Sequence, residues 1–111
     1  MRLSILLAAA LALQTVSVQL NWHAPAKSSE AVVGYNIYRA NAGSSAWVKI
    51  NKKPVPTPAY KDESVQRGHS YSYSIRSVDA KGHESEPSAP WSVTIPKNPK
   101  QKVVEADQSK Q

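Results

Sequence analysis

The chain has 111 residues, of which 41% are apolar and 20% are charged, and its formal net charge at pH 7 is +6. This length accommodates one small domain, and the composition is that of a globular protein rather than of a disordered or membrane-spanning one. The sequence contains no cysteine, which excludes a disulfide framework, a thiolate metal site and a cysteine nucleophile.

The first residues have the composition of an export signal. Arg2 precedes an apolar run over residues 3–13 that ends in small side chains. A positive start, a short apolar run and a small-x-small pattern are typical of a secretory signal peptide, so we predict a signal peptide over residues 1–12 with cleavage after Ala12. The run is too short for a transmembrane helix, which needs about 20 apolar residues. The alternative is that residues 3–13 form the first strand of the fold.

Export would place the mature protein outside the cytoplasm. Small extracellular domains of eukaryotes commonly depend on disulfides, which this chain cannot form. We therefore expect a bacterial protein that is secreted or periplasmic.

Beyond residue 15 the sequence alternates apolar and polar residues in short runs. Alternation with period two is typical of strands that bury one face, and no run here has helical spacing. The segments that we predict to be strands are residues 16–22, 32–39, 47–50, 59–62, 70–76 and 91–95. Short strands at regular spacing predict an all-β protein, an antiparallel sandwich or barrel. The core residues that we expect are Trp22, Tyr35, Ile37, Tyr73 and Ile75.

The segments between these strands carry turn and breaker residues. Pro54, Pro56 and Pro58 predict an extended connection or a sheet edge, because proline cannot donate to a strand ladder. Residues 79–82 predict a hairpin turn. Residues 97–111 contain few apolar side chains to offset the entropy of ordering them, and we expect a disordered basic tail there.

Several of these segments together resemble the fibronectin type III domain. Residues 17–22 are similar to the second strand of that family, which ends in a core tryptophan, and residues 33–39 are similar to its third strand. The resemblance covers residues 16–96. It implies an antiparallel immunoglobulin-like β-sandwich of about six to seven strands over residues 13–96. A first strand should precede Val16, and we expect it to be short or missing, which would leave a sheet edge open.

The spacing of Val65, Gly68 and Tyr71 resembles the corner that leads into the sixth strand of the family. Gly68 allows the chain to fold sharply, because glycine adopts positive φ without strain. The tyrosine ring can pack inside while its hydroxyl reaches back to the backbone. We predict a hydrogen bond between the Tyr71 hydroxyl and the Val65–Gly68 segment.

The residue types that bind metals or carry out catalysis form no recognisable constellation. His23, His69 and His83 fall on three different predicted loops, with no pair at metal-ligand spacing. No serine lies in a Gly-x-Ser-x-Gly elbow, and four glycines are too few for a phosphate-binding loop in addition to the turns. We therefore predict no metal, no cofactor and no enzymatic activity.

Two acidic pairs are candidates for a general acid and base. Asp62 with Glu63, and Glu84 with Glu86, lie in predicted turns. A glycosidase needs two carboxyls that face each other across a cleft, and a sandwich of this size offers little cleft. We expect these four side chains to be solvated charges.

The remaining candidates for function are surface residues. Trp47 follows a serine-rich turn beside a short strand, so it is the large aromatic side chain that we most expect to be exposed. It could stack on a sugar ring, anchor a protein partner, or cover the edge of the sandwich. We choose Trp47, Tyr38 and Arg76 as candidate ligand contacts. The outward phase of the predicted sheet contains Asn36, Tyr38, Ser70, Ser72, Ser74, Arg76, Ser92 and Thr94.

The resemblance implies a non-catalytic interaction module that binds protein or carbohydrate in the cell envelope or outside the cell. One alternative is an assembly subunit that self-associates through the open sheet edge. Another is a passive domain whose basic tail binds anionic surfaces. Within the predicted domain, residues 13–96, the positive charges are scattered along the sequence. We therefore expect no specific nucleic-acid binding.

Overall fold

The computed structural model describes residues 15–24, 31–98 and 102–107. The signal peptide predicted over residues 1–12 lies outside the described residues. The strands are β1 (Ser17–Asn21), β2 (Val32–Asn41), β3 (Val48–Lys49), β4 (Ala59–Asp62), β5 (Ser70–Asp79), β6 (Trp91–Thr94) and β7 (Val103–Asp107). The described residues contain no helix, in agreement with the all-β prediction.

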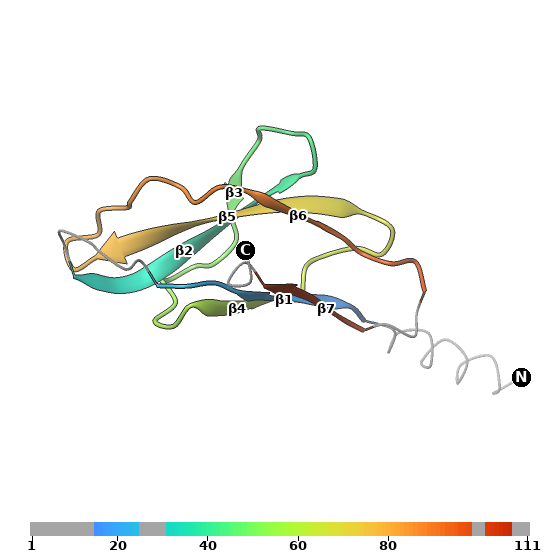
Figure 1. Cartoon of the computed structure of the whole chain (residues 1–111), viewed down its shortest axis with the longest axis horizontal. Coiled ribbons are helices and arrows are strands. Elements are labelled where there is room, and N and C mark those ends of the chain that lie inside the picture. The colour runs from blue at the N-terminus through green and yellow to red at the C-terminus, as the bar shows by residue number, and fades with distance from the viewer. Residues whose placement is uncertain (1–14, 25–30, 99–101, 108–111) are drawn as a thin grey trace, which may run out of the picture.

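The strands form two sheets that face each other (Figure 1). One sheet has four strands in the order β3-β2-β5-β6, and all of its pairs are antiparallel. The other has three strands in the order β4-β1-β7. The β1–β4 pair is antiparallel, but β1 and β7 are parallel. The fold is therefore the expected immunoglobulin-like sandwich, with one parallel pair that the sequence did not indicate.

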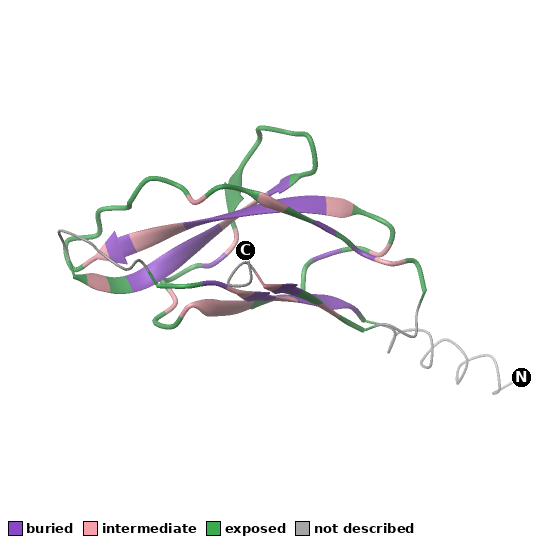
Figure 2. Cartoon of the chain, viewed as in Figure 1, coloured by how far each residue is buried: buried purple, intermediate pink, exposed green. Residues whose placement is uncertain are grey.

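The core lies between the two sheets (Figure 2). Alternation placed its residues correctly, because a strand that covers a core turns every second side chain inward. All five side chains that we expected in the core are buried, and Trp22 packs edge-on against Tyr35 with 5.4 Å between the ring centroids. A domain this small has a stability of roughly 4–12 kcal/mol, so the loss of one such ring, at about 3–5 kcal/mol, would leave little margin.

The expected tail contains a strand, so the prediction of disorder is wrong for residues 103–107. β7 pairs with β1 from Ser17↔Val103 to Asn21↔Asp107, and the Ser17 backbone N–H donates to the carbonyl of Lys102 at 2.8 Å. Ala106 is buried and packs against the core. Alternation in such a short stretch is weak, and the benefit of ordering it comes from pairing with a strand more than 80 residues away.

β7 also changes the expectation of an open sheet edge. The position beside β1, where a first strand was expected to be short or missing, is occupied by this C-terminal strand. Among the described residues the side of β1 opposite β4 is therefore paired.

A charged cluster joins the two sheets inside the sandwich. The Asp62 side chain on β4 is only 3% exposed and accepts hydrogen bonds from Arg39 of β2 at 2.8 Å and Tyr73 of β5 at 2.7 Å. Ser64 donates to the same carboxylate through its hydroxyl and its backbone N–H. The expectation that Asp62 is a solvated charge is wrong, because the inward phase of β4 carries it between the sheets.

The same cluster perturbs the ionisation of its members. Burial disfavours the charged form of Asp62, but hydrogen bonds from Ser64, Tyr73 and Arg39 outweigh it and hold the pKa of this carboxyl below its ordinary value. Burial, followed by the hydrogen bond to Asp62, raises the pKa of Tyr73. Asp62 is therefore ionised at neutral pH, and its role is to connect the sheets.

The corner that precedes β5 contains the predicted hydrogen bond. Gly68 has φ of 79°, a value that an L side chain rarely adopts. The backbone N–H of Gln66 donates to the Tyr71 hydroxyl at 2.9 Å, and Gln66 lies in the Val65–Gly68 segment. The Arg39 guanidinium lies over the Tyr71 ring, 4.9 Å from its centroid. The corner and the charged cluster therefore share one end of the core.

The proline-rich connection runs against the four-stranded sheet, which fits its prediction as an extended segment. Val55 forms an antiparallel bridge with Tyr35, with both backbone hydrogen bonds present. A Cβ atom added to Gly34 would lie 2.7 Å from the Cβ of Pro54. The close approach of this segment to β2 therefore requires glycine at position 34.

Candidate functional site

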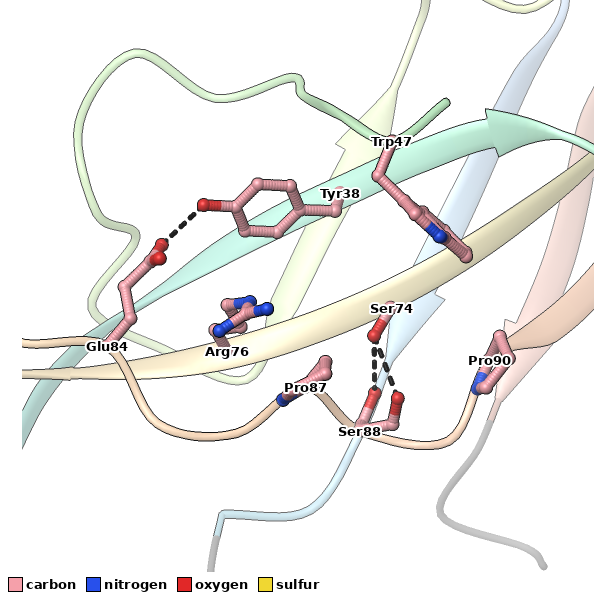
Figure 3. Close-up of a pocket in the computed structure, with 8 residues that line it drawn as sticks. All are labelled: Tyr38, Trp47, Ser74, Arg76, Glu84, Pro87, Ser88 and Pro90. Atoms are coloured by element: carbon pink, nitrogen blue, oxygen red, sulfur yellow. Dashed lines mark hydrogen bonds between the residues drawn. The ribbon is translucent and has the colours of Figure 1, made fainter. Parts of the chain in front are cut away.

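A groove crosses the outer face of the four-stranded sheet, and its volume is about 420 Å³ (Figure 3). Its floor is formed by Ser74 and Arg76 of β5. Tyr38 of β2 and Trp47, which lies just before β3, form one wall. The segment between β5 and β6 forms the other wall with Pro87, Ser88 and Pro90.

The second wall is held in place by serines that replace strand pairing. The backbone N–H of Ile75 donates to the Ser88 hydroxyl, and that of Ser77 donates to the Ser85 hydroxyl, each at 2.9 Å. In return, the N–H groups of Ser88 and Ser85 donate to the carbonyls of Ile75 and Ser77. Proline residues prevent this segment from forming a regular ladder, and serine hydroxyls satisfy the β5 backbone instead.

This segment also covers part of the face that we expected to be exposed. Ser72 and Ser74 on β5 and Asn36 on β2 are buried, so the expectation of a fully outward polar face is wrong at these positions. Ser74 donates to the carbonyl of Ser88 at 2.8 Å. Period two shows which side of a sheet a residue faces, and it does not show whether another segment lies over that side.

Glu84 closes one end of the groove. Its Oε2 atom accepts hydrogen bonds from the Tyr38 hydroxyl at 2.6 Å and from the Asn36 amide at 2.7 Å. Glu84 is exposed but not the simple solvated charge that we expected, because two side chains of β2 fix its position. Burial opposes its ionisation, yet the hydrogen bonds from Tyr38 and Asn36 and the charges of Arg76 and Lys49 lower its pKa.

Arg76 lies between the two ends of the groove. Its guanidinium lies 5.7 Å from the centroid of the Tyr38 ring and donates to the carbonyl of Ser85 at 3.0 Å. Tyr38 is therefore held by Glu84 through its hydroxyl and by Arg76 through its ring. Both interactions act before any ligand arrives, so this part of the groove is preorganised.

Trp47 is the large aromatic side chain that remains accessible, at 38% exposure. It lies outside the two-residue strand β3, which is shorter than the predicted strand over residues 47–50. Gly43, with φ of 83°, and a hydrogen bond from the Ala46 N–H to the Ser44 hydroxyl shape the loop that presents it. Figure 3 shows the indole at the opposite end of the groove from Glu84, with Pro90 on the facing wall.

The structure brings the three candidate contacts, Trp47, Tyr38 and Arg76, to one groove. Sequence reasoning missed Glu84 and the two prolines, Pro87 and Pro90, of the wall formed by the segment between β5 and β6. Their signal was the run Glu-Ser-Glu-Pro-Ser-Ala-Pro over residues 84–90, whose prolines exclude a regular strand beside β5. That ligands contact these residues stays a prediction.

The histidines do not form a site in the described part of the chain. His69 stacks on Tyr71 with 6.2 Å between ring centroids, and His83 lies 3.4 Å from Asp79. The described residues contain no group of three or more His, Cys, Asp or Glu side chains that could hold a metal ion.

The fold defines the chain as an immunoglobulin-like β-sandwich with a groove on its larger sheet. A family model described as the fibronectin type III domain matches residues 7–94. The chain belongs to the fibronectin type III domain family. The match begins at residue 7, within the segment that we predicted to be a signal peptide.

Curated relatives contain a similar segment within much longer chains. Amylopullulanase of Thermoanaerobacterium saccharolyticum is 36% identical over 69 residues, which are 62% of this chain and 5% of the relative. Human myomesin-2 is 32% identical over 66 residues, 59% of this chain and 4% of the relative. The chain therefore spans about a twentieth of these relatives.

Solved structures show the same fold at low sequence identity. A Fn3-like protein from Clostridium thermocellum matches with a TM-score of 0.59 and 23% identity, over 76% of this chain and 90% of that one. The twitchin kinase region of C. elegans matches with a TM-score of 0.53 and 22% identity, over 63% of this chain and 12% of that one. Among the described residues, no helix is long and apolar enough to cross a membrane.

Proposed function

We propose that this protein is a non-catalytic interaction module that binds a protein or carbohydrate partner through the groove of Trp47, Tyr38 and Arg76. The observation that carries the proposal is the groove itself, which presents an accessible indole at one end, with the Arg76 guanidinium on its floor and the Glu84 carboxylate at the other end. Binding surfaces characteristically combine exposed aromatic side chains with a few fixed polar groups.

The known relatives support a module rather than an enzyme. The family model covers most of the chain, and the segment shared with amylopullulanase is a small part of that protein. The two carboxylates of each acidic pair also do not face one cleft: Asp62 sits between the sheets while Glu63 is exposed, and Glu84 lines the groove while Glu86 does not. A glycosidase would need them across one cleft.

Affinity capture from a cell-envelope extract of the native host tests this proposal. The immobilised wild type is compared with Trp47→Ala and with Val103→Ala, which removes an exposed apolar side chain on the other sheet. We expect a protein or glycan component that the wild type and Val103→Ala retain and Trp47→Ala loses. Identical retention by all three proteins would reject the groove as the contact.

We also propose that the protein is exported and acts in the periplasm or outside the cell. The support is the arrangement of Arg2 and the apolar run over residues 3–13. Intact mass measurement on the protein purified from its host should give a chain that begins at Leu13. A chain that retains residues 1–12 would contradict export by cleavage at this site.

The strand order does not favour self-association through an open edge at β1. Because β7 pairs with β1, self-association at that edge would require β7 to leave its position.

A further inference from the structure

The chemistry of the groove narrows the kind of partner that fits it. Its walls are apolar, from Trp47 and two prolines, while its floor and one end carry a hydroxyl, a guanidinium and a carboxylate. We propose that the groove binds a neutral glycan, with one sugar ring stacked on the Trp47 indole and hydroxyls of the sugar units that follow along the groove bonded to Arg76 and Glu84. This inference rests on the proposed function, since it names the ligand class of the same groove.

The end of the groove that contains the Trp47 indole suits a sugar ring. Trp47 lies at the end of the groove away from Glu84, with Pro90 on the facing wall (Figure 3). A pyranose presents one face of C–H groups and a rim of hydroxyls, so it needs a flat apolar surface next to polar groups. An aromatic ring provides that flat surface at low entropic cost, because it has few rotatable bonds.

The charges of the groove favour a neutral ligand with hydroxyl groups. Glu84 lies close enough to Arg76, and to Lys49 outside the lining of the groove, for their positive charges to lower its pKa. The two charges that line the groove, Glu84 and Arg76, therefore offset each other. A strongly charged ligand would be attracted by one and repelled by the other. A hydroxyl can donate to the carboxylate and accept from the guanidinium, and hydrogen bonds to charged groups are stronger than those between neutral groups.

The backbone around the groove argues against an extended peptide. Extended peptides are commonly bound by backbone hydrogen bonds to an open strand edge. At Arg76, β5 pairs with Asn36 of β2 on one side. On its other side, the N–H groups of Ile75 and Ser77 are bonded to Ser88 and Ser85. A peptide in the groove would find no open edge in this part of β5.

A glycan array followed by titration calorimetry tests the proposal on the full chain. The array carries neutral and acidic glycans, and maltohexaose and cellohexaose are the neutral probes for calorimetry. We expect wild type and Val103→Ala to bind neutral glycans equally. Removal of a central aromatic contact should weaken binding about tenfold or more in Trp47→Ala, while Trp47→Tyr should keep part of the affinity.

A second arm separates failure of the ligand class from failure of the proposed function. Decaproline is titrated against the same proteins, because proline-rich peptides dock in grooves lined by aromatic residues without using a strand edge. If decaproline binds with dependence on Trp47 and neutral glycans do not, the glycan inference is overturned and the groove remains a binding site. If no neutral glycan on the array distinguishes wild type from Trp47→Ala, the glycan inference is likewise overturned. If the envelope capture also shows no such difference, the proposed function fails as well.

Discussion

Two clusters in this domain are built from the same groups and differ in where they lie. Between the sheets, Asp62 accepts hydrogen bonds from Tyr73 and Arg39. On the outer face, Glu84 accepts one from Tyr38, whose ring lies under the guanidinium of Arg76. Each cluster contains a carboxylate, a tyrosine hydroxyl and an arginine.

The difference in surroundings decides what each cluster does. The Asp62 carboxylate is buried, so its partners must compensate for the water it has lost, and removal of one leaves an uncompensated charge. Glu84 remains in contact with solvent, where a lost partner is replaced by water at small cost. The inner cluster therefore stabilises the fold, while the outer one is available to a ligand.

The largest expected effect is that of Asp62→Ala. It leaves Arg39 and Tyr73 in the core without their acceptor, and we expect a loss of about 3–5 kcal/mol in the free energy of unfolding. Urea unfolding followed by circular dichroism measures it. A midpoint within error of the wild type would contradict the structural role of the inner cluster.

The contribution of Asp62 to stability should be complete at neutral pH and should be lost in acid. The pKa of Asp62 is lowered in the folded state from the ordinary value of 3.8, so the unfolded chain binds the proton more readily as the pH falls below about 5. Stability from this group is complete above that range and is lost on acidification through the folded pKa. Unfolding midpoints measured from pH 7 to pH 2.5 should show a shallower acid decline in Asp62→Asn than in the wild type. Equal declines in the two proteins would contradict a contribution of ionised Asp62 to stability.

Deletion of residues 102–111 should weaken the sheet that carries Asp62 and leave the groove intact. β7 contributes the buried Ala106 and the half-buried Val104, and we expect a loss of roughly 1–2 kcal/mol in stability. The uncovered edge of β1 should also promote association, which light scattering would detect. A deletion variant with the same stability and the same oligomeric state as the full chain would show that β7 is dispensable.

A smaller effect is expected from Tyr71→Phe at the end of the inner cluster. The change removes the acceptor of the Gln66 N–H, and we expect a loss of about 1 kcal/mol in the free energy of unfolding. The ring remains beneath Arg39, so packing should change little. The loss in stability is measured as a lower denaturant midpoint, with the dependence of the free energy of unfolding on denaturant concentration unchanged. An unchanged midpoint would mean that water replaces the hydroxyl.

The smallest effect on stability is expected from Glu84→Gln. The amide keeps an oxygen that can accept from Tyr38 and loses only the charge on an exposed site, so stability should stay within about 0.5 kcal/mol of the wild type. Glycan affinity should fall, because the carboxylate is the strongest acceptor of the groove. A large loss of stability would show that the two clusters play similar roles.

The sequence by itself determined the strands, the core and the family. Alternation is a local property, so the burial of Trp22, Tyr35 and Tyr73 could be predicted without knowledge of any partner strand. The three candidate contacts were likewise found from the outward phase of their strands and from the turn beside Trp47. The corner hydrogen bond of Tyr71 could be predicted from the resemblance of a short local pattern to the corner of the family, and its partners lie only five residues apart.

Only the tertiary structure decided what lies across from each of these faces. The pairing of β7 with β1, the approach of Asp62 to Arg39, and that of Glu84 to Tyr38 join residues that are far apart in the chain. Alternation in β1 shows which of its side chains turn inward and not which strand lies beside it. The polar side chains of the other two pairs carry no periodic signal that identifies a partner. Their burial and pKa values follow from the segments that fold over them, because desolvation depends on all neighbouring atoms rather than on residue type.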